Sequence, residues 1–351
     1  MKHRLVTRSD FDGLVCAVLL RHVDLIDEIA FVHPKDVQDG VVEITGRDIL
    51  TNLPYAPEAF MVFDHHSSEA RRTGGTAANH RIVASAPSAA RVVYEHFGGA
   101  ERFPAVSDEL MEAVDRADSA AYERGDILAP RGWTLLNFLM DSRTGLGRFR
   151  DFRVSNYELM MNLIEACIRC DSADEILALP DVAERVALYR EQADLFVAQL
   201  RRVGRMVGDV VVVDLRDEEI IHAGNRFMVY ALFPEARVSV HVLWGRERRN
   251  TVLAVGRSII DRSSAVDIGA VMQRHGGGGH AAAGTCQVPH EQAAGVLADV
   301  IGAVRSSPAG ARAPGAGAHD AHPGTPPGDV RGSTGSTGTG VRSAPIATRV
   351  K

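Results

Sequence analysis

The sequence predicts an α/β protein with a parallel-sheet domain over residues 1–150, a helical linker over 151–208, a smaller α/β domain over 209–305 and a disordered tail over 306–351. Two observations lead to the prediction for residues 1–305. Short apolar runs alternate with helical patterns in the first and third segments, and apolar residues recur every three or four positions in the second. Such alternation is typical of a parallel sheet covered by helices on both faces.

In the first segment, short apolar runs indicate strands and the patterns between them indicate helices. The expected strands are 4–9, 29–33, 41–44 and 60–63, of which 41–44 has the weakest pattern. The expected helices are 14–22, 87–97 and 106–118.

The rest of the chain is assigned in the same way. Residues 155–203 form a long helical stretch, in which charges separate Leu188, Leu195 and Leu200. After it, the expected strands are 210–213, 238–244, 252–255 and 284–288, and the expected helices are 225–232, 266–274 and 291–304. The tail consists mostly of Gly, Pro, Ala, Ser and Thr, which cannot bury enough apolar area to offset chain entropy.

Composition limits the classes of function. The formal net charge of −6 argues against binding nucleic acid by bulk electrostatics, and an acidic protein that grips phosphate needs the local help of divalent cations. The four cysteines are too sparse for a disulfide scaffold. Cys167 and Cys170 form a C-x-x-C in a helical pattern, which indicates a buried helix face, with a zinc half-site as the alternative.

We expect a cytoplasmic protein without a membrane partner. The N-terminus runs straight into a strand and lacks the apolar region of a signal peptide. No apolar run approaches the roughly 20 residues that a membrane span needs.

Two groups of polar side chains follow expected strands. Asp10 and Asp12 lie where the first strand ends and a helix begins, and Asp64, His65 and His66 follow the strand 60–63. Ligand sites of open parallel sheets lie beyond the carboxyl ends of the strands. Crowded carboxylates repel each other unless a cation lies between them, so the groups together predict a metal site. The alternatives are a polar turn with a capping Asp and a surface loop.

Three further acidic residues are less specific. Asp48 follows the weakest expected strand, and many loops hold an acidic residue there. Asp115 and Asp118 are three apart at the end of an expected helix and could share a face. A solvated helix end is the alternative.

A glycine run over 276–279, followed by His280, is the main motif of the second domain. Glycines let backbone N–H groups approach an anion closely, and the histidine adds a donor. Arg257 and Ser258, at the end of an expected strand, are candidate phosphate contacts. A flexible turn is the alternative for the run.

These motifs together resemble those of DHH-family phosphoesterases with a C-terminal DHHA1 domain. The similar positions are Asp10 and Asp12 for the first motif, Asp48 for the second, Asp64, His65 and His66 for the third, Asp118 for the fourth, and 276–280 with 283–284 for the DHHA1 signature. The match runs over about residues 3–300 in the family's order. Within the family, residues 7–13 are most similar to exopolyphosphatase-related proteins.

The resemblance implies hydrolysis of phosphoester or phosphoanhydride bonds with two metal ions, Mn²⁺ or Mg²⁺. It implies that Asp10 and Asp48 bind the first ion, that Asp12, Asp48, His65 and Asp118 bind the second, that Asp64 orients the histidines, and that His66 contacts the phosphate or protonates the leaving oxygen. It further implies that the substrate is bound by Arg257, Ser258, Gly277, Gly278, Gly279 and His280.

One position departs from the family pattern. Members commonly carry a His a few residues before the first Asp, where this chain has the stretch 6–9 with Arg8 and no His. His33, at the end of a neighbouring strand, is a candidate substitute, and Arg8 could instead contact a phosphate. We therefore expect the first ion to bind weakly, or only when substrate arrives.

We expect an enzyme that acts on polyphosphate, a short oligonucleotide, a cyclic dinucleotide or a nucleotide, and we leave a homodimer open. The alternative is a nucleotide- or polyphosphate-binding protein with weak or no catalysis, which the missing His motivates. A third interpretation is an exonuclease that works in a larger complex.

Overall fold

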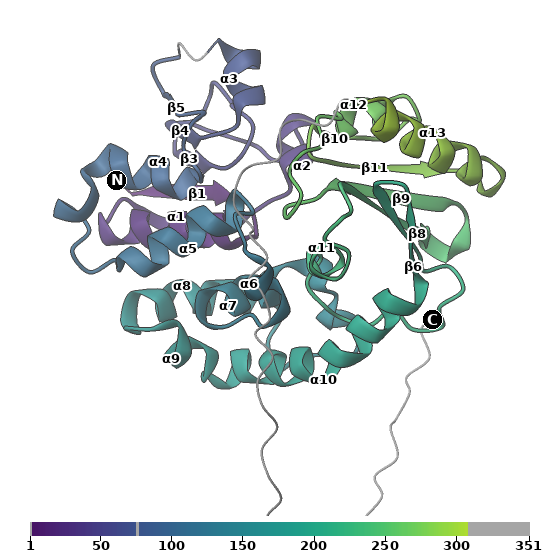
Figure 1. The fold of residues 1–351 in the computed structure, drawn as a ribbon. Coiled ribbons are helices and arrows are strands. Elements are labelled where there is room, and N and C mark those ends of the chain that lie inside the picture. Colours follow the sequence, from purple (N-terminus) through teal and green to yellow (C-terminus); the bar gives the residue numbers. More distant parts are fainter. Residues whose placement is uncertain (1, 75–76, 308–351) are drawn as a thin grey trace, which may run out of the picture.

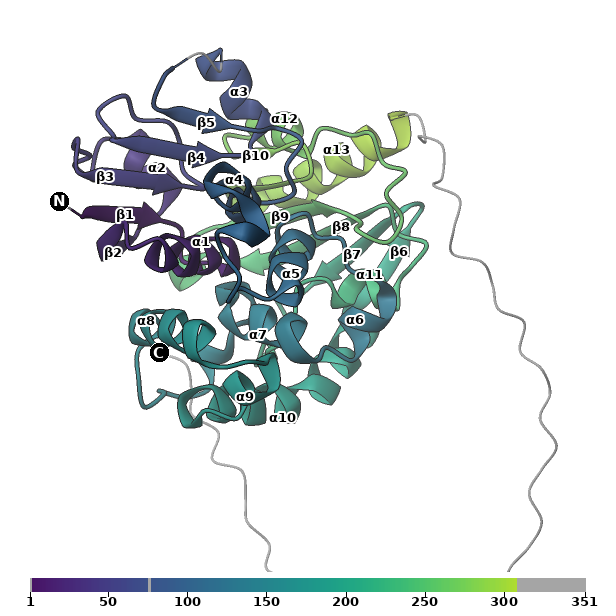
Figure 2. The same ribbon diagram turned by 90° about the vertical axis from the view of Figure 1, so that its left-hand side faces the viewer.

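The computed structural model describes residues 2–74 and 77–307, so the expected tail lies almost wholly outside the described residues. Two sheets stand side by side, and the helices α6 to α10 lie together below them (Figure 1 and Figure 2). The first sheet has the strand order β2-β1-β3-β4-β5 and is parallel throughout. The second has the order β10-β11-β9-β8-β7-β6, and only its β7–β8 pair is parallel.

The first part alternates strands and helices, as the sequence predicts. Its strands are β1 (His3–Thr7), β2 (Ile26–Phe31), β3 (Asp48–Thr51), β4 (Met61–Asp64) and β5 (His80–Ile82). Its helices are α1 (Phe11–His22), α2 (Pro34–Gln38), α3 (Ser67–Thr73), α4 (Ala89–Phe97), α5 (Asp108–Asp118), α6 (Arg124–Leu128) and α7 (Gly132–Met140).

The helix α1 is the centre of the first part. Its first ten residues are all buried, because it packs against β2 on one side and against α4, α5 and α8 on the others. A helix that is apolar all round is stable only when it is enclosed in this way. On the other face of the sheet, Val6, Leu50 and Val62 form a smaller apolar cluster with the segment around α2. Both faces of the sheet are therefore covered, and the carboxyl ends of the strands are left open.

Three helices connect the two parts, as predicted for residues 155–203. They are α8 (Asn156–Arg169), α9 (Ala173–Leu177) and α10 (Pro180–Val203). Cys167 is buried on α8 and Cys170 ends it, and neither belongs to a group of metal-ligating side chains among the described residues. This supports the buried helix face over the zinc half-site.

The second part is a mixed sheet with helices on both faces. Its strands are β6 (Gly204–Val207), β7 (Val210–Asp214), β8 (Val238–Trp244), β9 (Thr251–Arg257), β10 (Gly278–His280) and β11 (Ala283–Val288), and its helices are α11 (Met228–Leu232), α12 (Ile268–Gln273) and α13 (Ala293–Ser306). Along β7, Val210 and Val212 face the core under α12 and α13, whereas Val211 and Val213 belong to the core of the first part. One apolar core therefore continues through both parts.

One predicted strand is wrong, and the error matters for the site. Residues 41–44 are not in a strand, and the side chain of Val41 is 73% exposed. The strand that pairs with β1 begins at Asp48, and Arg4 lies opposite it. Asp48 therefore opens a strand instead of following one, which puts it at the amino-terminal edge of the sheet. The other expected strands and helices occur within a few residues of their predicted bounds.

Candidate metal centre

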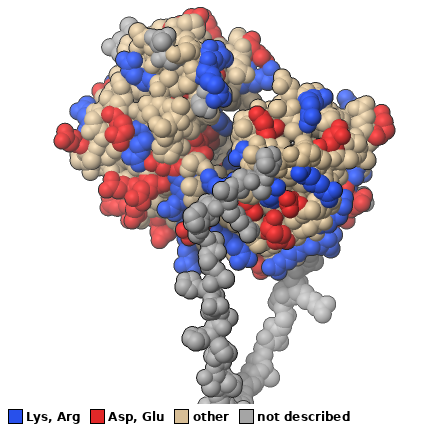
Figure 3. All heavy atoms as spheres, turned by 45° about the horizontal axis from the view of Figure 1, so that its top comes forward, with Lys and Arg blue, Asp and Glu red and all other residues tan. Residues whose placement is uncertain are grey.

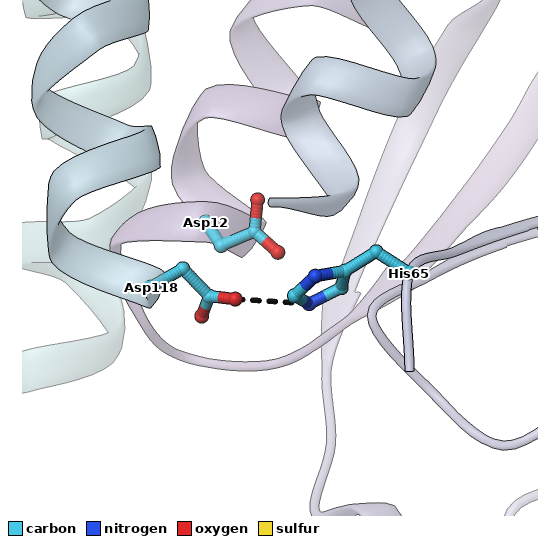
Figure 4. A group of neighbouring side chains, drawn as sticks. All are labelled: Asp12, His65 and Asp118. Atoms are coloured by element: carbon cyan, nitrogen blue, oxygen red, sulfur yellow. Dashed lines mark ion pairs between the residues drawn. The ribbon is translucent and has the colours of Figure 1, made fainter. Parts of the chain in front are cut away.

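Three side chains from separate elements meet at the carboxyl ends of the strands (Figure 4). Asp12 lies in the first turn of α1, His65 directly follows β4, and Asp118 ends α5. Each offers one ligand atom, and these atoms all lie within 4.8 Å of one another. The sequence predicts each of these residues as a ligand, and the fold brings them together.

Asp12 is held by the amino end of a helix. Its Oδ1 accepts a hydrogen bond from the backbone of Ala90 (2.8 Å), and its Oδ2 accepts one from Ala89 (3.1 Å), both in the first turn of α4. Burial raises the pKa of Asp12 well above its ordinary value, and the charges of Asp118 and Asp10 raise it further. Three carboxylates, of which Asp12 is buried and Asp10 and Asp118 are partly exposed, thus lie close together, and a divalent cation would relieve their repulsion.

His65 is oriented by its two ring nitrogens. Nδ1 lies 3.1 Å from the carbonyl oxygen of Ala86 and donates to it, which leaves Nε2 facing Asp118 Oδ2 at 2.9 Å. Burial alone would lower the pKa of His65, but the hydrogen bond and charge of Asp118 raise it to about 9. A histidine fixed in this way presents Nε2 to a metal ion once the proton leaves.

Asp10 lies beside the three-residue cluster and has two partners. Its Oδ1 accepts from the backbone of Gly13 (3.0 Å), which caps α1, and its Oδ2 lies 3.1 Å from Arg8 Nε. Burial raises the pKa of Asp10, and Arg8 opposes that shift. His33 caps α2 through Nδ1 and does not join the cluster. Arg8, not a histidine, is therefore the neighbour of this carboxylate.

Asp64 and His66 form a hydrogen-bonded pair at the same carboxyl-terminal edge of the sheet. Asp64 is fully buried, and its Oδ1 lies 2.7 Å from Nδ1 of the half-exposed His66. The carboxylate fixes Nδ1–H and leaves Nε2 of His66 directed outward. Burial lowers the pKa of His280, and the charges of His66, Arg226 and Arg8 lower it further, so β10 of the second part faces this edge. Figure 3 shows the cleft between the two parts.

Comparison with known proteins identifies the family. No family model and no curated protein matches the sequence. Among solved structures, a pGpG-specific phosphodiesterase from Vibrio cholerae, PggH, is 55% identical; the match covers 88% of this chain and 100% of that chain, with a TM-score of 0.77.

The chain belongs to the DHH family of phosphoesterases.

Two more distant structures also match. CDC45 from Entamoeba histolytica is 9% identical, with a TM-score of 0.50 over 87% of this chain and 96% of that chain, which supports the fold alone. RecJ from Thermus thermophilus, in complex with Mn²⁺, is 17% identical, with a TM-score of 0.43 over 88% of this chain and 53% of that chain.

As a DHH phosphoesterase, this protein is a metal-dependent hydrolase. The donors fit such an ion, since two carboxylates and an imidazole suit Mn²⁺ and related divalent cations. Three protein ligands also leave coordination positions open for water and substrate. Within the described ranges, no helix is long and apolar enough to cross a membrane.

In this DHH phosphoesterase, two acidic residues that the sequence offers as metal ligands, Asp48 and Asp115, lie away from the cluster. The prediction for Asp48 is contradicted by its position: it opens β3 at the opposite edge of the sheet and binds Arg4 through Oδ1 (2.7 Å) and Oδ2 (2.8 Å). Although burial alone would raise the pKa of Asp48, the hydrogen bonds from Arg4 hold it below its ordinary value. Asp115 binds Arg91 (2.6 Å) and Ser88 (2.7 Å), so Asp118 is the residue of this helix that faces the cluster.

Asn52 follows the third strand of the sheet, which is where Asp48 was expected. It follows β3 with a φ of 54°, and its backbone N–H donates to Phe63 (3.1 Å), so it lies at the same edge as Asp10 and Asp64. The side chain is 1% exposed, and neither of its polar atoms has a partner within residues 2–74 and 77–307. A buried amide without partners is costly unless something else satisfies it.

The predicted substrate-binding residues lie together on the second sheet. Gly277 and Gly279 allow close approach, because a Cβ would lie 2.2 Å from the carbonyl oxygens of Thr285 and Ala283, respectively. The glycine run therefore forms the edge strand β10 and not a free loop. The hydroxyl of Ser258 accepts from two backbone N–H groups of the following turn, which shapes the chain after Arg257.

Proposed function

We propose that this protein hydrolyses pGpG, the 5′-phosphorylated dinucleotide of guanosine, to mononucleotides. The observation that carries the proposal is the 55% identity to a pGpG-specific phosphodiesterase over the full length of that chain. Water attacks the phosphorus of the internal diester, the bond from that phosphorus to the ribose 3′-oxygen breaks, and the 3′-oxygen leaves with a proton. The products are two molecules of guanosine monophosphate.

The metal site is the first component of the proposal. Asp12, His65 and Asp118 hold the ion, and the backbone of Ala89 and Ala90 fixes the first of these ligands. A bound divalent cation would supply Lewis-acid activation of the attacking water and neutralise charge on the phosphate. The imidazole ligand favours Mn²⁺ over Mg²⁺, because Mg²⁺ prefers oxygen ligands alone.

A second ion is proposed at Asp10 and Asn52. Asp10 supplies one carboxylate, and the amide oxygen of Asn52 is a neutral ligand at the same edge of the sheet. Because only one of these two donors is charged and Arg8 competes for it, this ion binds more weakly than the first.

His66 is proposed as the general acid. Asp64 holds its Nδ1–H at 2.7 Å, so the outward Nε2 can deliver a proton to the leaving ribose oxygen. From the other side of the cleft, His280 and Arg257 are proposed to contact the far end of the substrate, with the backbone of Gly277, Gly278 and Gly279 close by. Ser258 shapes the turn that presents Arg257.

A substrate panel tests the proposal. Metal-stripped protein is supplied with Mn²⁺, and hydrolysis of pGpG, polyphosphate, a cyclic dinucleotide and a nucleotide bisphosphate is followed by chromatography. We expect pGpG to be hydrolysed with the highest kcat/KM and to yield only guanosine monophosphate. Preferential hydrolysis of polyphosphate would contradict the proposed substrate, and tight pGpG binding without turnover would favour a binding protein.

A further inference from the structure

Two arginines from different parts of the molecule converge on one carboxylate. Asp141 follows α7, and its Oδ1 lies 2.7 Å from Nε of Arg143, while its Oδ2 lies 3.3 Å from Nε of Arg226. Arg226 comes from the second part, just before α11. Within residues 2–74 and 77–307, neither guanidinium has another ion-pair partner closer than 4.0 Å. Two positive charges thus share one negative charge.

The pair remains accessible to a ligand. The side chains of Arg143 and Arg226 are 57% and 38% exposed, whereas that of Asp141 is 14% exposed. Partial desolvation by its neighbours lowers the pKa of Arg226 to about 10, and the charge of Arg143 contributes to that shift. Two neighbouring cations that repel each other favour the arrival of a further anion.

Both arginines lie near the proposed active site. Arg143 is among the charges that lower the pKa of Asp10, next to the metal cluster. Arg226 is among the charges that lower the pKa of His280, on the facing strand β10. The ring of Phe227, the residue after Arg226, lies 5.7 Å from that of Tyr122, which follows Asp118 by four residues. The pair therefore lies close to the end of α5 that carries Asp118, and its charges reach groups of both parts.

The arginines are also held in place before any ligand arrives. The guanidinium of Arg226 lies over the ring of Phe227, 4.3 Å from its centroid. The backbone N–H of Arg143 donates to Asp141 Oδ1 (2.9 Å), and Gly224 donates to the carbonyl of Thr144 (3.1 Å), which ties this loop to the second part. Fixed guanidinium groups lose little entropy when they bind phosphate oxygens in a bidentate way.

We infer that Arg143 and Arg226 bind the 5′-terminal phosphate of the substrate while the bridging phosphate lies at the metal cluster. This inference rests on the proposed hydrolysis of pGpG. A terminal phosphate carries more negative charge and more free oxygens than an internal diester, so a pair of arginines beside the metal cluster favours it. The pair thereby selects short substrates with a phosphorylated 5′ end.

The test compares pGpG with GpG, the same dinucleotide without the 5′-phosphate, in wild type and in Arg143→Gln. We expect Arg143→Gln to raise the KM for pGpG by about 10- to 100-fold, the range for loss of a charged hydrogen bond, and to leave the KM for GpG within twofold. Arg226→Lys keeps the positive charge but loses the bidentate guanidinium group, so it should raise the KM for pGpG less than Arg143→Gln does. The control is Arg150→Gln, because Arg150 also pairs with one carboxylate, Glu184 (2.6 Å), and lies over a ring, that of Phe152 (5.3 Å).

Dissociation constants measured on the same variants separate this inference from the proposed function. If wild type hydrolyses neither dinucleotide, the proposed function is wrong, and the inference is still tested by the affinity for pGpG relative to GpG. Equal losses for pGpG and GpG in Arg143→Gln, or no loss for pGpG, would overturn the inference. The same selective loss in Arg150→Gln would also overturn it, because the effect would then not belong to this pair.

Discussion

At the scale of single residues, the proton on His65 competes with a metal ion for the same nitrogen. The pKa of about 9 means that Nε2 is protonated and paired with Asp118 at neutral pH when no metal is bound. We predict that metal binding releases a proton, and that affinity rises up to tenfold per pH unit from pH 7 and levels off near pH 9. Calorimetry in buffers of different ionisation enthalpy measures the released proton.

The same pair predicts how the stability of the metal-free protein depends on pH. The pKa of His65 is raised on folding, so its stabilising contribution is complete below the unfolded value of about 6.5. That contribution is lost as the pH rises through about 9. A metal affinity and a metal-free melting temperature that are both constant from pH 7 to 9 would contradict this account of His65.

Asn52 provides a prediction about the second ion. We expect Asn52→Asp to tighten binding of a second Mn²⁺ by about tenfold or more, because a second carboxylate would join Asp10. Metal titration followed by calorimetry should give one tight and one weak equivalent in wild type, and two tight equivalents in the variant. Unchanged binding in Asn52→Asp would place the second ion, if any, away from this residue.

Individual ligands could be predicted where they directly follow a clear signal. Asp10 and Asp12 end an apolar run at a helix start, and His65 follows an unmistakable strand, so their meeting at one edge follows from parallel pairing. Asn52 could not be found, because an amide after a strand has no distinctive pattern. Its importance arises from burial and missing partners, which only the fold reveals.

At the scale of elements, the misplaced third strand shows what periodicity cannot resolve. Residues 41–44 hold three apolar side chains, whereas β3 (Asp48–Thr51) holds only two, and it is stabilised by pairing on both sides with β1 and β4. Long-range pairing thus overrides the local apolar pattern. The seven-residue shift from 41 to 48 is enough to move Asp48 from the metal edge to the opposite edge.

The start of α1 gives a prediction at this scale. A Cβ on Gly13 would lie 2.1 Å from the carbonyl oxygen of Arg8, so Gly13→Ala must displace the loop that carries Asp10. We expect a loss of stability of about 1–3 kcal/mol and a lower kcat. Chemical denaturation and initial rates measure both.

Gly125→Ala is the matched control, since nothing lies within 4 Å of the position of its Cβ. That variant should be neutral or gain up to about 1 kcal/mol. Full activity and stability in Gly13→Ala would mean that this close approach does not position the site.

At the scale of the whole molecule, the continuous core predicts one cooperative unfolding transition. The two tryptophans report on different parts, because Trp133 lies in α7 and Trp244 ends β8. Side chains of both parts share one core, which includes Val211 and Phe227 with Phe138. We predict that denaturation of Trp133→Phe and Trp244→Phe, each followed by the remaining tryptophan, gives coincident transitions. Two separated midpoints would mean that the parts unfold independently.

Because one core runs through both parts, the domain boundaries at residues 150 and 208 stay predictions made from the sequence. The cleft lies between the parts, and the proposed function needs groups from both: the metal ligands from the first and His280 and Arg226 from the second. A rigid connection through the shared core would keep these groups in register, without a hinge.

We propose that hydrolysis depends on a metal ion held by Asp12, His65 and Asp118. The most direct test is the initial rate of pGpG hydrolysis by metal-stripped protein as Mn²⁺ is added back, compared between Asp118→Asn and Asp115→Asn. These two carboxylates lie one turn apart on α5, but only Asp118 faces the cluster. We predict that Asp118→Asn loses at least about 100-fold in rate at saturating substrate and needs far more Mn²⁺, while Asp115→Asn, which loses the Arg91 contact, keeps the wild-type Mn²⁺ dependence. Equal Mn²⁺ dependence in wild type and Asp118→Asn would contradict the claim.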